Sequence, residues 1–147
     1  MNKIVKKSSL SGQPWTLLDS TLEGVDEGER LVRAVLQQSR LTEDDRHWVM
    51  LAVREVLVNA VAHGNRFDPG KKVRLRISPD ENIMAIEIGD EGDGFDPHRV
   101  PDPKMAQNLE KQSGRGLLIA RALLDELTIS RLKPRGTLVY MSKRIPV

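Results

Sequence analysis

The stretch EVLVNAVAHGN, residues 55–65, combines an apolar helix pattern with three regularly spaced polar side chains. Apolar residues fill most other positions of residues 48–62, whereas Glu55, Asn59 and His63 recur every four residues. A spacing of four brings side chains onto one stripe of an α-helix. The sequence therefore predicts a largely buried helix that presents a carboxylate, an amide and an imidazole on a single face.

This polar stripe has two interpretations. Burial of an unpaired carboxylate is costly, so Glu55 could simply pair with a base such as Arg54 or Arg66 at the edge of the core. Alternatively, the stripe is a site, because amide and carboxylate oxygens suit Mg²⁺ and a Glu beside such a metal can act as a general base. His63 adds less, since a His at a helix end commonly caps a carbonyl.

Composition narrows the class of protein. The chain has 147 residues, 39% hydrophobic and 30% charged, which is typical of one soluble globular domain. No apolar run reaches the roughly 18–20 residues of a membrane span, and the basic start has no signal-peptide core. With no cysteine, disulfides, thiolate metal sites and cysteine nucleophiles are excluded, and we expect a cytoplasmic setting. A net charge of +2 and five aromatic residues argue against nucleic-acid binding.

The order of predicted elements indicates an α+β fold. Thr42 is a plausible N-cap for the helix that carries the polar stripe, and Gly64 and Asn65 are a good signal for its end. A turn at residues 79–82 would join two of the strands as an antiparallel hairpin. The expected strands cover residues 14–20, 71–78, 81–90, 127–132 and 137–143, and the expected helices cover residues 25–40, 41–63 and 116–127. We expect a two-layer α/β sandwich, with a mostly antiparallel sheet and three helices on one face.

A second polar segment, GDEGDGFDP at residues 89–97, follows an apolar strand. Gly92 and Gly94 let the backbone turn tightly and let a flat ligand approach without a Cβ clash. Asp90 could then accept a hydrogen bond from an exocyclic amine. A calcium loop of the EF-hand type needs oxygen ligands where these two glycines stand, so it fits poorly, whereas a plain acidic turn remains an alternative.

A third segment, SGRGLLIARALLDE at residues 113–126, places a glycine-rich turn before a helix. The first N–H groups of such a helix point at an anion, and Arg115 can add a charge-assisted bond to a phosphate. The dinucleotide fingerprint is not matched, because Ile119 stands where its third glycine would be. A P-loop is excluded, because the sequence contains no G-x-x-x-x-G-K-[ST].

In this order, the three segments resemble the N, G1 and G2 boxes of the GHKL ATPase superfamily, the Bergerat fold of gyrase, histidine kinases and mismatch-repair ATPases. RGTLV, residues 135–139, resembles the last adenine-contacting strand of that fold. The resemblance covers about residues 14–144 of a single domain spanning residues 1–147. EVLVNAVAHGN and GRGLLIARALLDEL are most similar to the small anti-sigma factor serine/threonine protein kinases.

The resemblance implies a role for each polar residue of the helix stripe. Asn59 would hold Mg²⁺, Glu55 would be the general base, and His63 would face the bound ATP. Asp90 would accept a hydrogen bond from the adenine amino group, and Thr137 would support the adenine.

The glycine-rich segments would shape the remainder of the ATP site. Gly92 and Gly94 would form part of the adenine pocket. Residues 97–113 would be the ATP lid, from which Lys111 would reach the γ-phosphate. The phosphates would be wrapped by the residues that precede the third helix, Gly114, Arg115 and Gly116.

The resemblance also implies a function. Such proteins phosphorylate a STAS-type anti-sigma-factor antagonist, hold a sigma factor inactive when not so engaged, and work as homodimers, here through the first strand and first helix. One alternative is an ATP-binding module that sequesters a regulator without phosphoryl transfer. Another is a histidine-kinase catalytic domain, although His47 does not resemble a phosphoacceptor site.

Overall fold

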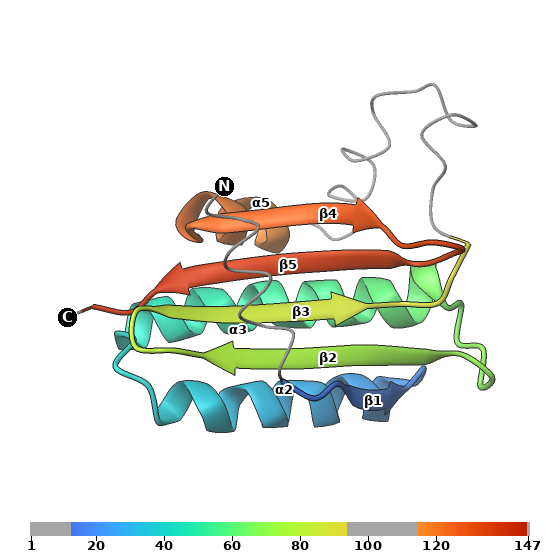
Figure 1. Cartoon of the computed structure of the whole chain (residues 1–147), viewed down its shortest axis with the longest axis horizontal. Coiled ribbons are helices and arrows are strands. Elements are labelled where there is room, and N and C mark those ends of the chain that lie inside the picture. The colour runs from blue at the N-terminus through green and yellow to red at the C-terminus, as the bar shows by residue number, and fades with distance from the viewer. Residues whose placement is uncertain (1–12, 94–114, 147) are drawn as a thin grey trace.

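One antiparallel sheet and a layer of helices make up the two layers of the molecule (Figure 1). The computed structural model describes residues 13–93 and 115–146, and these residues confirm the predicted α+β sandwich. Its helices are α2 (Leu22–Gln37), α3 (Glu43–Val58), η1 (Asn59–Gly64) and α5 (Arg115–Leu123). Its strands are β1 (Thr16–Asp19), β2 (Lys72–Pro79), β3 (Ile83–Gly89), β4 (Glu126–Arg131) and β5 (Thr137–Arg144).

The five strands of the described sheet lie in the order β1-β2-β3-β5-β4, and every neighbouring pair is antiparallel. The predicted hairpin joins β2 to β3, with Ile77 opposite Ile86. Its turn is held by Asp80, whose Oδ1 accepts from the N–H groups of Asn82 and Ile83 at 2.7 Å each. The Asp80 carboxylate thus accepts hydrogen bonds that a backbone carbonyl would otherwise accept in a tight turn.

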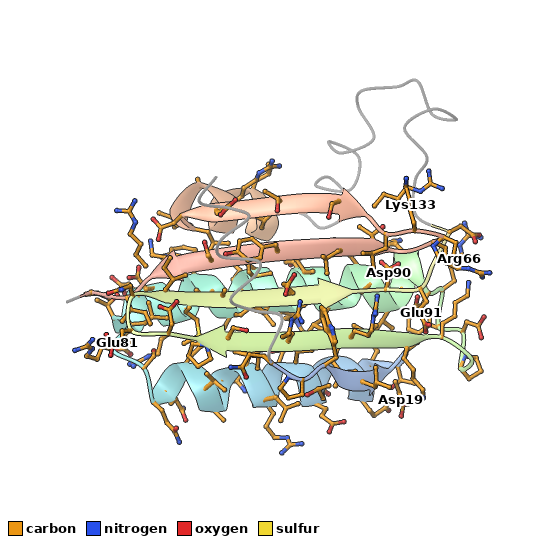
Figure 2. All side chains as sticks on the ribbon, in the orientation of Figure 1. Asp19, Arg66, Glu81, Asp90, Glu91 and Lys133 are labelled. Atoms are coloured by element: carbon orange, nitrogen blue, oxygen red, sulfur yellow. The ribbon has the colours of Figure 1, made fainter. Side chains whose placement is uncertain are left out.

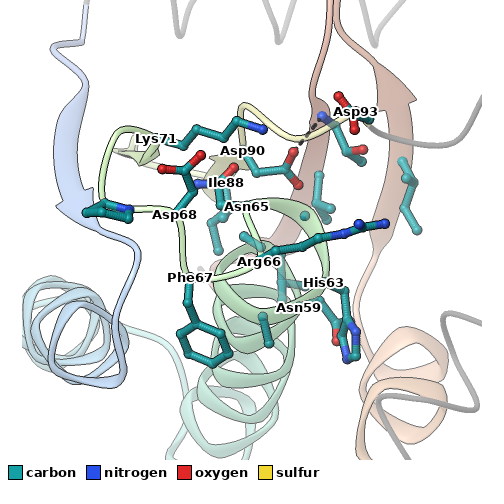
Figure 3. Close-up of a pocket in the computed structure, with 18 of the residues that line it drawn as sticks. Asn59, His63, Asn65, Arg66, Phe67, Asp68, Lys71, Ile88, Asp90 and Asp93 are labelled. Carbon is teal, nitrogen blue, oxygen red and sulfur yellow. Dashed lines mark hydrogen bonds between the residues drawn. The ribbon is translucent and has the colours of Figure 1, made fainter.

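The helices α2, α3 and α5 lie side by side on one face of the sheet, with α3 in the middle (Figures 1 and 3). The predicted apolar faces meet there: Met84, Ile86 and Ile88 of β3 are about 1% exposed, and Val53 and Leu57 of α3 are fully buried. Burial of this apolar surface is the main stabilising contribution to the fold. It also fixes α3 and η1, which together carry the polar stripe, over the sheet.

The opposite face of the sheet carries the polar half of the alternating strand pattern. Arg76 of β2 forms an ion pair with Glu87 of β3, with Nη2 2.6 Å from Oε1. The guanidinium of Arg76 also lies 4.0 Å from the ring centroid of Trp15, in cation–π geometry. The apolar residues of β2, Val73 and Leu75, point to the helices, as the alternation predicts.

Side-chain caps set where the first two helices begin. Thr42 accepts from the N–H of Asp45 at 3.1 Å, which confirms the predicted N-cap of α3. Thr21 accepts from the N–H of Gly24 at 3.0 Å, so α2 begins three residues before the predicted position. No helix of the described residues is long and apolar enough to cross a membrane.

The third helix is shorter than predicted. Residues 124–127 were expected to be helical, but α5 ends at Leu123. The N–H of Asp125 donates to the carbonyl of Ser142 at 3.1 Å, and Leu127 pairs with Met141 in the sheet. Pairing with β5 therefore outweighs the helical pattern of this segment.

The helix that carries the polar stripe ends in a wide turn. Its predicted end at Gly64 is confirmed, but residues Asn59–Gly64 form a π-helix rather than an α-helix. The N–H of Asn65 donates to the carbonyl of Ala60 at 2.8 Å, and that of Phe67 to Val61 at 2.9 Å. Such wide turns are often found at functional sites, and this one begins at Asn59.

Candidate functional site

A cavity of about 920 Å³ opens where the end of α3, η1 and the loop of residues 65–71 meet β3, β4 and β5 (Figure 3). Its volume is within the range of about 300–1,000 Å³ that small-molecule sites occupy. Figure 2 shows Arg66, Asp90 and Glu91 gathered at this end of the sheet, whereas Glu81 lies at the opposite end.

Apolar side chains from both layers form part of the cavity wall. They come from the helix and from three strands that are distant in the sequence. The residues are Val56, Ala60, Ile88, Leu127, Ile129 and Val139. Apolar walls with a few convergent polar groups are typical of sites for small molecules and cofactors.

Asp90 is the most buried acidic residue of the cavity, with 7% of its surface exposed. Its Oδ1 accepts from the N–H of Gly92 at 2.9 Å and from the N–H of Thr137 at 3.2 Å. Both bonds use the same oxygen, which leaves Oδ2 for a donor group of a ligand. Burial raises the pKa of the Asp90 carboxyl, although these two hydrogen bonds and the charge of Lys71 oppose that rise.

Glycines allow the backbone to close tightly around Asp90. A Cβ on Gly64 would lie 2.4 Å from Asp90 Oδ2, and a Cβ on Gly92 would lie 2.0 Å from the Gly64 carbonyl oxygen. Gly136 has φ +108°, and a Cβ there would lie 2.3 Å from the Asp90 carbonyl oxygen. The sequence predicts that Gly92 lets a ligand approach. In this structure, the absence of a Cβ at Gly92 makes space for the carbonyl oxygen of Gly64, at the end of η1.

The polar stripe is divided between the cavity and its surroundings. Asn59 and His63 line the cavity, as does Thr137 from the start of β5. Glu55 lies one turn earlier on α3, is partly buried, and is not among the described residues that line the cavity. Burial raises the pKa of Glu55, and the neighbouring charge of Arg54 opposes this.

An ion pair between Glu55 and Arg54 was one interpretation of the stripe. The guanidinium of Arg54 instead donates from Nη1 to Glu29 Oε1 of α2 at 2.5 Å. Arg66, the other base considered, lines the cavity. The arrangement therefore favours a site over a simple edge pairing.

Two basic residues in the cavity were not predicted as site residues. Arg66 and Lys71 both line it, and Figure 3 shows the Arg66 side chain extended across the cavity. Arg66 and Phe67 have φ values of 51° and 58°, in the left-handed region that non-glycine residues seldom adopt. Backbone outliers of this kind cluster at functional sites, but a sequence gives little indication of where they occur. Basic side chains suit an anionic ligand, and the acidic residues Asp68, Asp90 and Asp93 line the same cavity.

Several predicted residues lie outside the described part of the chain. These are the lid at residues 97–113 with Lys111, and the glycines Gly94 and Gly114. Arg115 and Gly116 are described only as the first residues of α5. Their proposed contacts with phosphates stay predictions.

The described residues fit a magnesium ion only in combination with a nucleotide. They contain no group of three or more His, Asp or Glu side chains that could hold a metal by itself. Mg²⁺ commonly keeps several waters and binds through one or two protein oxygens together with substrate phosphates. The amide oxygen of Asn59, in the wall of the cavity, can supply such a ligand.

Comparison with known proteins identifies the family. A model of the histidine kinase-like ATPase domain matches residues 18–143, which is most of the chain. The chain belongs to this family. The GHKL resemblance drawn from the three motifs is thereby confirmed.

Curated relatives of this ATPase domain include anti-sigma F factors. The anti-sigma F factor of Geobacillus thermodenitrificans is 31% identical over 117 residues, which cover 78% of this chain and 80% of that protein. Those of Geobacillus sp. WCH70 and Oceanobacillus iheyensis are 30% and 29% identical, with the same coverage. The relatives are thus matched over most of their length and belong to one functional class.

Proposed function

We propose that this chain is an anti-sigma factor of the protein serine/threonine kinase type. It transfers the γ-phosphoryl group of ATP to a Ser or Thr of a STAS-type antagonist and regulates transcription by switching between this antagonist and a sigma factor. The observation that carries the proposal is the buried Asp90 carboxylate, which has one oxygen available in a partly apolar cavity that Asn59 also lines.

In this proposal, Asp90 selects the adenine base. Oδ2 accepts a hydrogen bond from the exocyclic amino group, while Oδ1 stays bound to the N–H groups of Gly92 and Thr137. Ile88 and Val139 offer apolar surface to the ring. A buried acceptor of this kind discriminates against bases that lack the amino group, because the carboxylate would then be left without a partner.

At the phosphate end of the nucleotide, the site has to neutralise the negative charge of the phosphates and orient them. Mg²⁺ bound with ATP would neutralise phosphate charge, and Asn59 would hold this ion through its amide oxygen. Arg66, which also lines the cavity, adds positive charge there. Phosphoryl transfer depends mainly on such positioning and charge neutralisation.

Glu55 serves as the general base. Its carboxylate takes the proton of the substrate hydroxyl as the hydroxyl oxygen forms a bond to the γ-phosphorus, and the bond to the bridging oxygen of ADP breaks. The pKa of Glu55 is raised by burial, which brings the group closer to the operating pH, where a general base is most effective. Docking of the protein substrate over the site would bring the Ser or Thr hydroxyl of the substrate to Glu55.

The choice of partners is supported by the names of the relatives, which are anti-sigma F factors. We propose a sigma factor and its antagonist as alternative partners of this chain. A homodimer through β1 and α2 is part of the proposal, because Leu17 and Leu22 on these elements are 61% and 58% exposed. Light scattering of the purified chain measures the oligomeric state.

One observation favours a second candidate function. Glu55 is not among the described residues that line the cavity, so ATP binding does not by itself require this residue. A module that binds ATP and sequesters a regulator without phosphoryl transfer would have the same cavity. The two candidates differ in whether label moves from ATP to a partner.

The experiment that tests the proposal is calorimetric titration with ATP, with and without Mg²⁺, followed by incubation with γ-labelled ATP and a panel of STAS-domain proteins. Mg²⁺-dependent binding with label on a Ser or Thr of one partner is the expected result. Binding without transfer to any STAS protein would favour the sequestering module. Absence of ATP binding would overturn both candidates.

A further inference from the structure

The side chain of Asn65 joins segments that are far apart in the sequence. It is 1% exposed and lies directly after η1. Its Nδ2 donates to Ser20 Oγ at 2.9 Å and to the Lys72 carbonyl at 3.1 Å, and its Oδ1 accepts from the N–H of Glu91 at 2.8 Å. Both donors and the acceptor are therefore engaged by protein groups, although Asn65 forms part of the cavity wall.

The partners of Asn65 are themselves joined to one another. Ser20, 2% exposed, donates from Oγ to the Lys71 carbonyl at 2.5 Å. Glu91 accepts at Oε2 from the N–H of Lys72 at 2.5 Å. We call these four residues, Ser20, Asn65, Lys72 and Glu91, the Asn65 network. It connects the β1–α2 junction, the end of η1, the start of β2 and the loop after β3.

The Asn65 network supports the residues that form the ATP site. Glu91 lies between Asp90, whose carboxylate enters the cavity, and Gly92, whose N–H binds that carboxylate. Figure 3 shows Asn65 next to Asp90 at the end of the helix. The loop touches the helix end closely, since a Cβ on Gly64 would lie 2.4 Å from Asp90 Oδ2. A small displacement of Glu91 would therefore move the carboxylate relative to the cavity.

We propose that Asn65 is a positioning residue of the ATP site, that Ser20 acts through it, and that the Glu91 carboxylate supports the same loop through the Lys72 N–H. The Asn65 network holds the Asp90–Gly92 loop and Lys71 in the geometry that receives the nucleotide. Through Ser20, the Asn65 network also links the β1–α2 junction to this loop. The inference rests on the proposed function, because it requires that the cavity bind ATP.

The first test compares two serines in the full chain. Ser20→Ala removes one donated and one accepted hydrogen bond at a residue outside the cavity lining. Ser39→Ala is the matched control, because Ser39 Oγ donates to the Leu36 carbonyl at 2.6 Å and accepts from the N–H of Leu41 at 3.3 Å, away from the cavity. The two variants are compared for unfolding temperature and for the Kd of ATP, measured well below both unfolding temperatures.

The expected result separates affinity from stability. Both serine variants should lose some thermal stability, but only Ser20→Ala should bind ATP more weakly, by about three- to tenfold, the effect of one hydrogen bond. A merely structural role of Ser20 would leave the Kd of the folded protein unchanged. Equal ATP affinity of Ser20→Ala and Ser39→Ala would overturn the inference.

The second test uses Glu91, which also lies outside the described lining of the cavity. Glu91→Ala removes the acceptor for the Lys72 N–H, whereas Glu91→Gln keeps an oxygen acceptor. We expect weaker ATP binding in the first variant and recovery in the second. Weakening by both to the same extent would contradict the positioning role and indicate a charge effect.

If the unaltered chain binds ATP but neither Ser20→Ala nor Glu91→Ala changes the Kd, only this inference fails. If the unaltered chain does not bind ATP, the proposed function fails as well.

Discussion

Asp90 and Thr137 are joined by two hydrogen bonds that run in opposite directions. The N–H of Asp90 donates to the carbonyl of Thr137 at 3.0 Å, and the N–H of Thr137 donates to Asp90 Oδ1 at 3.2 Å. The end of β3 is thus tied to the start of β5, and the carboxylate is oriented by backbone groups that do not depend on any ligand.

Replacement of Asp90 by Asn should weaken ATP binding about ten- to a hundredfold, the effect of losing a hydrogen bond to a charged group. Asn can keep the acceptor at Oδ1, but its NH₂ group would face the adenine amino group, so two donors would meet. Calorimetric titration measures the change. Asp80→Asn is a matched control, because Asp80 also accepts two backbone N–H bonds through Oδ1 and lies in the β2–β3 turn. Similar loss in both variants would contradict the assignment of Asp90 to the base.

The same substitution should stabilise the nucleotide-free protein at neutral pH. Burial raises the pKa of Asp90 above its ordinary value of 3.8, so between that value and the raised folded pKa the folded state holds more protons than the unfolded state. Stability therefore falls as pH rises through this window, and the full cost of ionisation is present above the folded pKa. Asp90→Asn removes this cost.

The measurement is denaturant unfolding of both proteins at a series of pH values without nucleotide. The advantage of Asp90→Asn in free energy of unfolding should be greatest above the folded pKa. It should shrink as pH falls through the window and reach a constant value below about 3.8. A difference that does not vary with pH would show that the ionised carboxylate of Asp90 is not destabilising.

Glu55→Ala should leave ATP binding within about twofold of the original value and reduce phosphoryl transfer by about 10²–10⁴-fold, as expected for loss of a general base. Binding should persist because Glu55 is not among the described residues that line the cavity. Transfer of label to the STAS-type substrate is measured at saturating ATP. Glu43→Ala, at the exposed start of the same helix, is the control. Full transfer activity in Glu55→Ala would exclude Glu55 as the base.

Gly92→Ala should destabilise the protein by about 1–3 kcal/mol and weaken ATP binding, because its Cβ would lie 2.0 Å from the Gly64 carbonyl oxygen and force the Asp90 loop away from η1. Gly70→Ala is the matched control in a loop that flanks the same cavity. A Cβ there meets only Asp68 Oδ1, at 3.3 Å, and we expect a change within about 0.5 kcal/mol. Unfolding curves and ATP titrations of both variants give the comparison. Normal binding by Gly92→Ala would show that the loop can move without loss of the site.

Most of the fold could be predicted from local patterns. Alternation of apolar residues located β2 and β3, and Thr42 with the acidic residues after it located the start of α3. These signals are local, because a cap or an alternating face involves residues that are close in the sequence. The end of α5 was predicted four residues too late, because backbone pairing of Asp125 and Leu127 with β5 is a long-range interaction.

The candidate site was predicted in part. Asn59, His63, Asp90 and Thr137 belong to recognisable motifs, and the structure brings all four to one cavity. Arg66 and Lys71 belong to no motif, and they line the cavity because the chain after η1 turns back with two residues in the left-handed region. The sequence identifies Asn65 only as a signal for the end of the helix.

The sequence by itself determined the type of domain and the chemistry that its motifs can perform. Residue type and spacing are sufficient for this, because a carboxylate, an amide and glycine-rich turns have the same properties wherever they lie. Only the tertiary structure decided which of these groups meet and which stay apart. Asp90 is oriented by a residue 47 positions away, and Asn65 is bound to Ser20, 45 positions earlier. Burial of the apolar core brings such distant residues together in space. No local pattern in the sequence specifies which residues then meet.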